Sequence, residues 1–269
     1  MAIFGKSRNV SKSNKAFKSL NEFFFLVGDI GRFAARFFKE GFKAPFEWRE
    51  IMRQSVEIGY HSLSLVGITA FIMGLVLTIQ SRPTLVEFGA ESWLPAMVSV
   101  SIVREIGPVI TALIFAGKIG SRIGAELGSM KATEQIDAME VSGTNPFKYL
   151  VTTRILSTTL MLPLLVIFAD VIALYGAYLG VNIKGIVSPH LFFSQVIDAL
   201  EYSDLIPSII KTFFFGFTIG LIGCYMGYHS KKGTEGVGKS ANSSVVIASL
   251  MVFILDLLAV QITDLFYEI

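Results

Sequence analysis

Long apolar runs separated by short polar segments dominate the chain from residue 62 onward. A helix needs about 20 mostly apolar residues to cross the hydrocarbon core of a bilayer. Five runs are about that long or longer, and they cover residues 62–80, 93–127, 150–181, 206–228 and 244–266. Because lipid offers no hydrogen-bond partners to an open backbone, such runs must be helical. The pattern therefore predicts an all-α integral membrane protein with about five transmembrane units.

The second run, residues 93–127, is too long for one straight span and carries helix-breaking residues near its middle. Arg104 and Glu105 are followed there by Gly107 and Pro108. Proline removes a helical hydrogen bond and disfavours helical geometry in the residue before it. We therefore expect a broken or re-entrant element near Gly107-Pro108.

The first 53 residues differ from the rest, because they hold 11 of the 23 lysines and arginines and no run apolar enough to span. Their core, "FKSLNEFFFLVGDIGRFAARFFKEGFKAPFEW", interleaves phenylalanines with four basic residues, Arg32, Arg36, Lys39 and Lys43. This pattern is typical of an amphipathic helix that lies in the membrane interface. No apolar signal core follows the Lys- and Ser-rich start, so we expect an uncleaved cytoplasmic N-terminus. The sequence thus divides into a cytoplasmic or interfacial segment, residues 1–53, and a transmembrane domain, residues 54–269.

Charge placement predicts the orientation of the spans. Composition agrees with lipid as the main solvent, since 52% of residues are hydrophobic and 16% are charged, against about a quarter charged in soluble domains. With a cytoplasmic N-terminus, the basic clusters of the N-terminal segment and of the two loops near residues 131 and 231 all lie inside. Only Arg82 and Lys184 lie outside. Because lysine and arginine are retained in cytoplasmic loops, we expect the C-terminus outside.

Other chemistry is sparse in the sequence. Cys224 is the single cysteine, and the three histidines, His61, His190 and His229, are far apart. Neither a disulfide nor a metal site is indicated. A formal net charge of +2 is too small to favour nucleic acid as a partner.

A polar stretch, "GSMKATEQIDAMEVSGTNP" at residues 128–146, connects the second and third runs on the cytoplasmic side. Apolar or small residues recur in it at helical spacing, at Ala132, Ile136, Met139 and Gly143. With charged residues over the remaining surface, this spacing predicts a short amphipathic helix at about residues 130–143. On the residues alone, the helix is either a solvated connector or an element that docks into a groove of another protein.

Residues 233–240, "GTEGVGKS", match the P-loop pattern, with Lys239 and Ser240 in the phosphate and magnesium positions. That pattern binds nucleotide only between a strand and a helix of a soluble sheet. Here one apolar run ends near residue 228 and another begins near residue 244. We therefore interpret the segment as a glycine-rich cytoplasmic turn.

The candidate ionisable residues inside the runs are Arg104, Glu105, Asp170, Lys211 and Asp256. A charge at the centre of a span costs about 2.5–3.5 kcal/mol on insertion scales, so such residues face a partner or a wet cavity. They can be structural ion pairs, for example between Lys211 and Asp256, or they can contact a substrate. A stripe of small residues on the second run, from Gly117 through Gly120, Gly124 and Gly128, predicts close helix packing.

The stretch "GPVITALIFAGKIGSRIGAELGSMKATEQIDAMEVSGTNPFKYLVTTRILS", with "GTEGVGKSANSSVV" further on, resembles the MlaE/YrbE permeases. These are membrane subunits of ABC systems that work with MCE proteins to move phospholipids between membranes. The resemblance runs from about residue 55 to the C-terminus. It implies a non-catalytic homodimeric permease of the bacterial inner membrane, with a periplasmic C-terminus, a cytoplasmic ATPase partner that binds ATP and Mg²⁺, and a periplasmic MCE-domain partner. This chain itself would hold no cofactor.

The same resemblance implies roles for two groups of residues. The segment from Glu134 onward matches the coupling helix that inserts into the ATPase subunit, which gives the candidate coupling residues Glu134, Gln135, Ile136, Asp137, Met139 and Glu140. The charged positions Arg104, Glu105, Lys211 and Asp256 match residues that line the outward-facing lipid cavity near the dimer interface.

The leading hypothesis is therefore an ABC permease whose four intramembrane charges hold or gate a phospholipid headgroup. Lys211 and Arg104 would donate hydrogen bonds to a phosphate. The alternative is a secondary, proton-coupled transporter in which Asp170, Glu105 and Asp256 form a proton relay, although no inverted repeat supports it. An intramembrane enzyme is disfavoured, since neither a His-Glu metal motif nor a serine elbow is present.

Overall fold

The computed structural model describes residues 25–41, 46–183, 185 and 187–267, and it divides the chain into two units, Met1–Phe46 and Glu47–Ile269. The described part of the first unit is a helix over residues 25–41. Ion pairs one turn apart, Arg32 with Asp29 and Arg36 with Glu40, lie along this helix. The predicted interfacial position of residues 1–24 and 42–45 lies outside the described residues.

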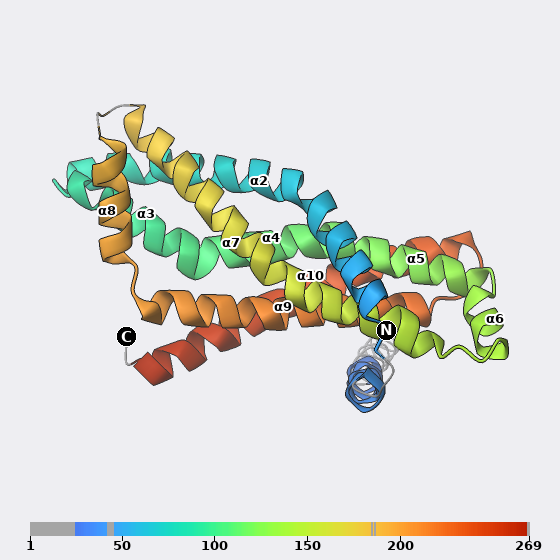
Figure 1. Cartoon of the computed structure of the whole chain (residues 1–269). Coiled ribbons are helices and arrows are strands. Elements are labelled where there is room, and N and C mark those ends of the chain that lie inside the picture. Colours follow the sequence, from blue (N-terminus) through green and yellow to red (C-terminus); the bar gives the residue numbers. More distant parts are fainter. Residues whose placement is uncertain (1–24, 42–45, 184, 186, 268–269) are drawn as a thin grey trace, which may run out of the picture. The chain divides into compact units, whose positions relative to one another are not determined.

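The second unit is a bundle of long helices (Figure 1). Five helical stretches are long and apolar enough to cross a membrane, namely Trp48–Glu87, Glu91–Ala132, Phe147–Asn182, Tyr202–Tyr228 and Thr234–Phe266. The described residues contain no strand. The predicted all-α membrane architecture with five spans is therefore confirmed.

The spans are longer than the apolar runs that predicted them. The elements in chain order are α2 (Trp48–Glu87), η1 (Glu91–Trp93), α3 (Leu94–Ser101), η2 (Ile102–Ile106), α4 (Gly107–Phe115), η3 (Ala116–Gly120), α5 (Ser121–Ala132), α6 (Gln135–Val141), η4 (Phe147–Thr152), α7 (Thr153–Asn182), α8 (Pro189–Ala199), α9 (Tyr202–Tyr228) and α10 (Thr234–Tyr267). Residues 48–53 form the first turns of α2, and residues 234–240 form the first turns of α10. Within this unit, α6 and α8 lie at opposite ends (Figure 1).

The second span passes Gly107 and Pro108 without a break. Residues 94–132 are helical throughout, and the distortion takes the form of a π-helical segment, η2, directly before Gly107. In the π register the residue at position 108 would donate to the Val103 carbonyl, which proline cannot do. The Ser208 hydroxyl from α9 donates to that carbonyl instead, at 2.7 Å. The expected break or re-entrant element is thus a π distortion, held by a hydrogen bond from another helix.

Glycines let α2 and α7 pack backbone against backbone. A Cβ atom at Gly74 would overlap the Ala173 carbonyl, and one at Gly176 would overlap the Phe71 carbonyl oxygen. Small residues permit this close approach between membrane helices. Gly124 of the predicted small-residue stripe works in the same way, since a Cβ there would lie 3.1 Å from the Ser240 carbonyl oxygen of α10, whereas Gly117 of that stripe has no atom within 4 Å of its Cβ position.

Gly176→Ala is therefore expected to destabilise the protein, because the added methyl group forces α2 and α7 apart. Overpacking of this kind costs about 1–3 kcal/mol. Gly117→Ala is the matched control, since no atom lies within 4 Å of the Cβ position there and the gain in helix propensity is the same. Thermal unfolding in detergent should show a lower midpoint for the Gly176 variant only. Equal midpoints for the two variants would contradict this packing.

The P-loop-like segment has the geometry of a helix start. The chain turns at Gly233, where φ is +99°, and enters α10 at Thr234. The Ser240 hydroxyl donates to the Gly124 carbonyl at 2.9 Å and is buried. The predicted glycine-rich turn is thus confined to the residues before Thr234, and Ser240 serves to pack α10 against α5.

Candidate functional site

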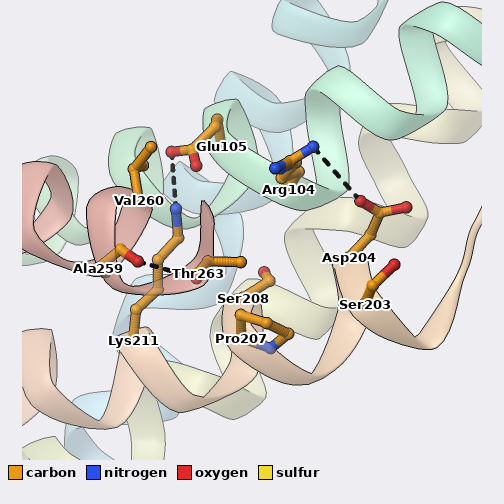
Figure 2. A pocket seen from close by; sticks show the side chains of 10 residues that line it. All are labelled: Arg104, Glu105, Ser203, Asp204, Pro207, Ser208, Lys211, Ala259, Val260 and Thr263. Carbon is orange, nitrogen blue, oxygen red and sulfur yellow. Dashed lines mark hydrogen bonds and ion pairs between the residues drawn. The ribbon is translucent and has the colours of Figure 1, made fainter. Parts of the chain in front are cut away.

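A cluster of three charged side chains lies among the spans. Lys211 on α9 contacts Glu105 of η2, with Nζ 2.7 Å from Oε2, and Asp256 of α10, with Nζ 2.9 Å from Oδ1. The Lys211 side chain is 5% exposed, whereas that of Glu105 is 37% exposed. Figure 2 shows the lysine extending from α9 toward Glu105. The pair between Lys211 and Asp256 that the sequence suggested is confirmed, and Glu105 joins it.

The cluster carries more acid than base. One ammonium group faces two carboxylates, and it is held by charge-assisted hydrogen bonds, which are about twice as strong as neutral ones. Breaking a buried ion pair by removing one partner typically costs about 3–5 kcal/mol, because the remaining charge is left uncompensated. The lysine is thus both the structural centre of the cluster and its hydrogen-bond donor.

Arg104 lies beside this cluster and belongs to a second, looser set of charges. Its guanidinium nitrogens lie 3.8 Å from Asp204 Oδ1 and 3.6 Å from Asp264 Oδ1. Arg104, Glu105 and Lys211 line one pocket together with seven other residues, Ser203, Asp204, Pro207, Ser208, Ala259, Val260 and Thr263 (Figure 2). The pocket therefore places two cationic groups next to apolar and hydroxyl-bearing surface.

Asp204 and Asp264 were missed by the sequence analysis. Asp204 lies two residues before the predicted start of its apolar run, and Asp264 lies close to the end of another. Asp204 also accepts the backbone N–H of Glu201 at 3.3 Å, which caps the start of α9. A carboxylate at a helix N-terminus looks like an ordinary cap in the sequence, so its second contact, with Arg104, could be found only in three dimensions.

The distortion of the second span helps to place these charges. Arg104 and Glu105 both lie in η2, where a wider turn shifts the register of the helix. Such single-turn π segments are common at functional sites. Ser208, whose hydroxyl holds this turn, is one helical turn before Lys211 on α9. The two helices are therefore bonded to each other at the level of the cluster.

Asp170 lies apart from the cluster. It is on α7, where its Oδ1 atom borders the Cα of Gly107, and the ion pairs of the described residues do not include it. Gly107 follows Glu105 by two positions, so the two residues face nearly opposite sides of their helix. Glu105 and Asp256 meet on Lys211, but Asp170 does not join them as the proton-relay alternative requires.

At the α6 end of the bundle, the predicted coupling residues begin at a sharp turn. Glu134 has a φ of +59° and is the only residue other than glycine in the left-handed region among the described residues. Its carboxylate accepts a hydrogen bond from Lys232 at 2.5 Å, and this contact raises the pKa of the lysine. Lys131 pairs with Asp137 at 2.7 Å. These contacts fix the direction in which α6 leaves α5.

The two faces of α6 have different environments. Ile136, the centre of the predicted apolar stripe, is 1% exposed and packs into its own chain. Val141 is 90% exposed, and Gln135 and Glu140 are exposed with it, while Asp137 and Met139 are partly exposed. The exposed surface of α6 thus differs from the predicted stripe. The exposure of Val141 was not predicted, because a single valine beyond the stripe gives no periodic signal.

An ion-pair network fixes α5 to its neighbours. Arg122 on α5 pairs with Glu57 of α2 and, at 2.6 Å, with Glu126. Glu126 in turn pairs at 3.2 Å with Arg154 of α7. The network therefore ties α5, which continues into the turn before α6, to α2 and α7.

Comparison with known proteins agrees with this geometry. A family model described as Permease MlaE matches residues 51–262. A probable ABC transporter permease protein of Rickettsia typhi is 40% identical over 227 residues, which cover 84% of this chain and 86% of the relative. The intermembrane phospholipid transport system permease protein MlaE of Haemophilus influenzae is 33% identical over 249 residues, or 91% of this chain and 94% of the relative. A probable ABC transporter permease protein of Synechocystis is 32% identical over 238 residues, or 88% of each chain.

The family model's range covers nearly all of the five candidate spans and both groups of predicted site residues. Their names describe a transport subunit rather than a catalytic enzyme. The chain is therefore a multi-pass membrane protein that belongs to the MlaE family of ABC transporter permeases.

Proposed function

We propose that this permease moves phospholipids between the inner and outer membranes of a bacterium, driven by a separate ATPase subunit and assisted by a periplasmic MCE-domain protein. The observation that carries the proposal is the buried Lys211, held between Glu105 and Asp256 beside Arg104. The name of the Haemophilus influenzae relative supports the substrate class. A phospholipid brings one phosphate into a largely apolar site, and this cluster offers the matching cations.

The cluster can exchange one set of anionic partners for another. Glu105 and Asp256 accept the Lys211 hydrogen bonds. An entering phosphate oxygen competes for the same ammonium group and for the guanidinium of Arg104, which binds phosphate in a bidentate manner. The carboxylates keep the cations placed without a ligand, and their repulsion of the phosphate favours its later release.

One helix connects this cluster with the proposed ATPase contact. Residues 94–132 are continuously helical, carry Arg104 and Glu105 in η2, and lead through the Glu134 turn into α6. We infer that α6 docks into the ATPase and that ATP and Mg²⁺ bind to that partner. ATP-driven movement of α6 would then shift η2 relative to α9 and alter the cluster.

A homodimer in the inner membrane completes the proposal. The α10 span is largely exposed and apolar, with Leu250, Phe253 and Leu257 each more than half exposed, and a second copy can cover this face. The basic N-terminal segment and the lysines near α6 favour a cytoplasmic N-terminus and a periplasmic C-terminus. Each dimer would then present two α6 helices to two ATPase subunits.

The experiment that tests this function measures phospholipid transfer by the assembled complex in proteoliposomes. Vesicles that contain the permease, its ATPase and its MCE partner should transfer a labelled phospholipid to acceptor vesicles only when ATP is supplied. The proton-coupled alternative predicts transfer that needs no ATPase and follows a pH gradient.

A further inference from the structure

Asp170 is the intramembrane acid that the proposed lipid site does not use. It lies on α7 within the span Phe147–Asn182, and its Oδ1 atom is buried without a hydrogen-bond partner in the described structure. Buried polar atoms are nearly always hydrogen-bonded, so an orphaned oxygen calls for an explanation. An intramembrane ionisable residue marks a functional site by default.

No ion pair of the described residues joins a cation to Asp170. Lys211 is shared by Glu105 and Asp256, and Arg104 faces Asp204 and Asp264. The facing part of α2, residues 62–81, contains no charged residue. A carboxylate without a partner in an apolar medium is so costly that the group takes up a proton instead.

A backbone carbonyl that can accept such a proton lies near the same point of η2. The position that a Cβ atom of Gly107 would occupy overlaps Asp170 Oδ1 and lies 2.9 Å from the Ile102 carbonyl oxygen. That carbonyl already accepts the Gly107 N–H, but a carbonyl oxygen has a second lone pair. A side chain at position 107 would overlap Asp170 Oδ1, so glycine leaves the acid its place beside η2.

We propose that Asp170 is a protonated carboxylic acid whose hydroxyl group donates to the Ile102 carbonyl and thereby fixes η2 against α7. Asp170 is thus a positioning residue for Arg104 and Glu105, which lie in the same π segment. Ser208 holds this segment from the α9 side and Asp170 holds it from the α7 side. The positioning role rests on the proposed function, but the protonation does not.

Infrared difference spectroscopy of the purified chain at neutral pH tests the protonation directly. The wild-type spectrum minus that of Asp170→Asn should contain the C=O stretching band of a protonated carboxylic acid and lack carboxylate bands. The Glu105→Gln variant is the control, because it alters a different acid, and its spectrum should still contain the Asp170 band. If Asp170→Asn does not assemble, Asp170→Ala gives the same difference, since a smaller side chain fits beside Gly107. Carboxylate bands in the difference spectrum would overturn the proposal.

Transfer assays test the positioning role. Asp170→Asn keeps a neutral donor of the same shape and should transfer phospholipid at close to the wild-type rate. Asp170→Ala lacks the donor, and its transfer rate should be about fivefold lower, because one hydrogen bond typically changes an equilibrium constant by about that factor. Equal rates for Asp170→Ala and wild type, or an equal loss in both variants, would overturn the positioning role. Failure of the wild type to transfer phospholipid would overturn the proposed function and leave the infrared result unaffected.

Discussion

Lys211→Ala is expected to reduce phospholipid transfer by at least about tenfold, because the substitution removes a charged hydrogen-bond donor worth about 1.5–3 kcal/mol. It also leaves Glu105 and Asp256 facing each other with no cation between them. The measurement is the initial rate at which a labelled phospholipid leaves proteoliposomes that contain the assembled complex and ATP.

Two further variants separate lost function from lost folding. Lys239→Ala makes the same change at an exposed lysine of α10 and should transfer lipid normally. Lys211→Ala combined with Glu105→Gln removes one of the uncompensated carboxylates, so it should recover thermal stability without recovering transfer. Wild-type transfer by Lys211→Ala would show that the cluster plays no part in transport.

Val141→Asp is expected to release the ATPase from the complex, because it puts a charge on the most exposed apolar residue of α6. Full burial of a valine side chain contributes about 1.5–3 kcal/mol, and a buried carboxylate without a partner adds a desolvation cost. Gentle affinity purification, followed by mass spectrometry of the bound proteins, measures the ATPase retained per permease.

The matched control for this change is Val86→Asp. Val86 lies in the last turn of α2 and is 49% exposed. That variant should retain the ATPase fully. Thermal midpoints of both variants should stay close to wild type, since neither valine is buried. Full retention of the ATPase by Val141→Asp would show that the ATPase does not contact this face of α6.

The apolar runs predicted the five spans because hydrocarbon imposes both length and helicity on any segment that crosses it. The ends of the spans were less predictable. Polar turns at residues 48–53 and 234–240 continue the helices beyond the apolar runs, and hydropathy carries no signal for a helix that leaves the lipid.

The distortion at Pro108 was predicted in place but not in form. The sequence shows the missing donor, whereas the Ser208 hydroxyl that replaces it comes from a residue about 100 positions away. Sequence periodicity likewise identified α6 as amphipathic but could not tell which face packs into its own chain. Ile136 is buried, and Val141 is exposed.

The charge cluster was likewise predictable from the sequence only in part. The cost of charge in lipid predicted that Lys211 and Asp256 would find partners, and they find each other. The geometry that adds Glu105 and excludes Asp170 depends on the helical face that each residue occupies around η2. A one-residue register shift in a π segment changes that face, and no sequence pattern reports it.

The most direct test of the central claim, an ATP-driven phospholipid permease, is the dependence of lipid transfer on the partner ATPase. Proteoliposomes with the complete complex should transfer labelled phospholipid when ATP and Mg²⁺ are present. Transfer should stop when the ATPase is omitted or when ATP is replaced by a non-hydrolysable analogue, whether or not a pH gradient is imposed. Transfer that continues without the ATPase and follows the pH gradient would contradict the claim and identify the chain as a proton-coupled carrier.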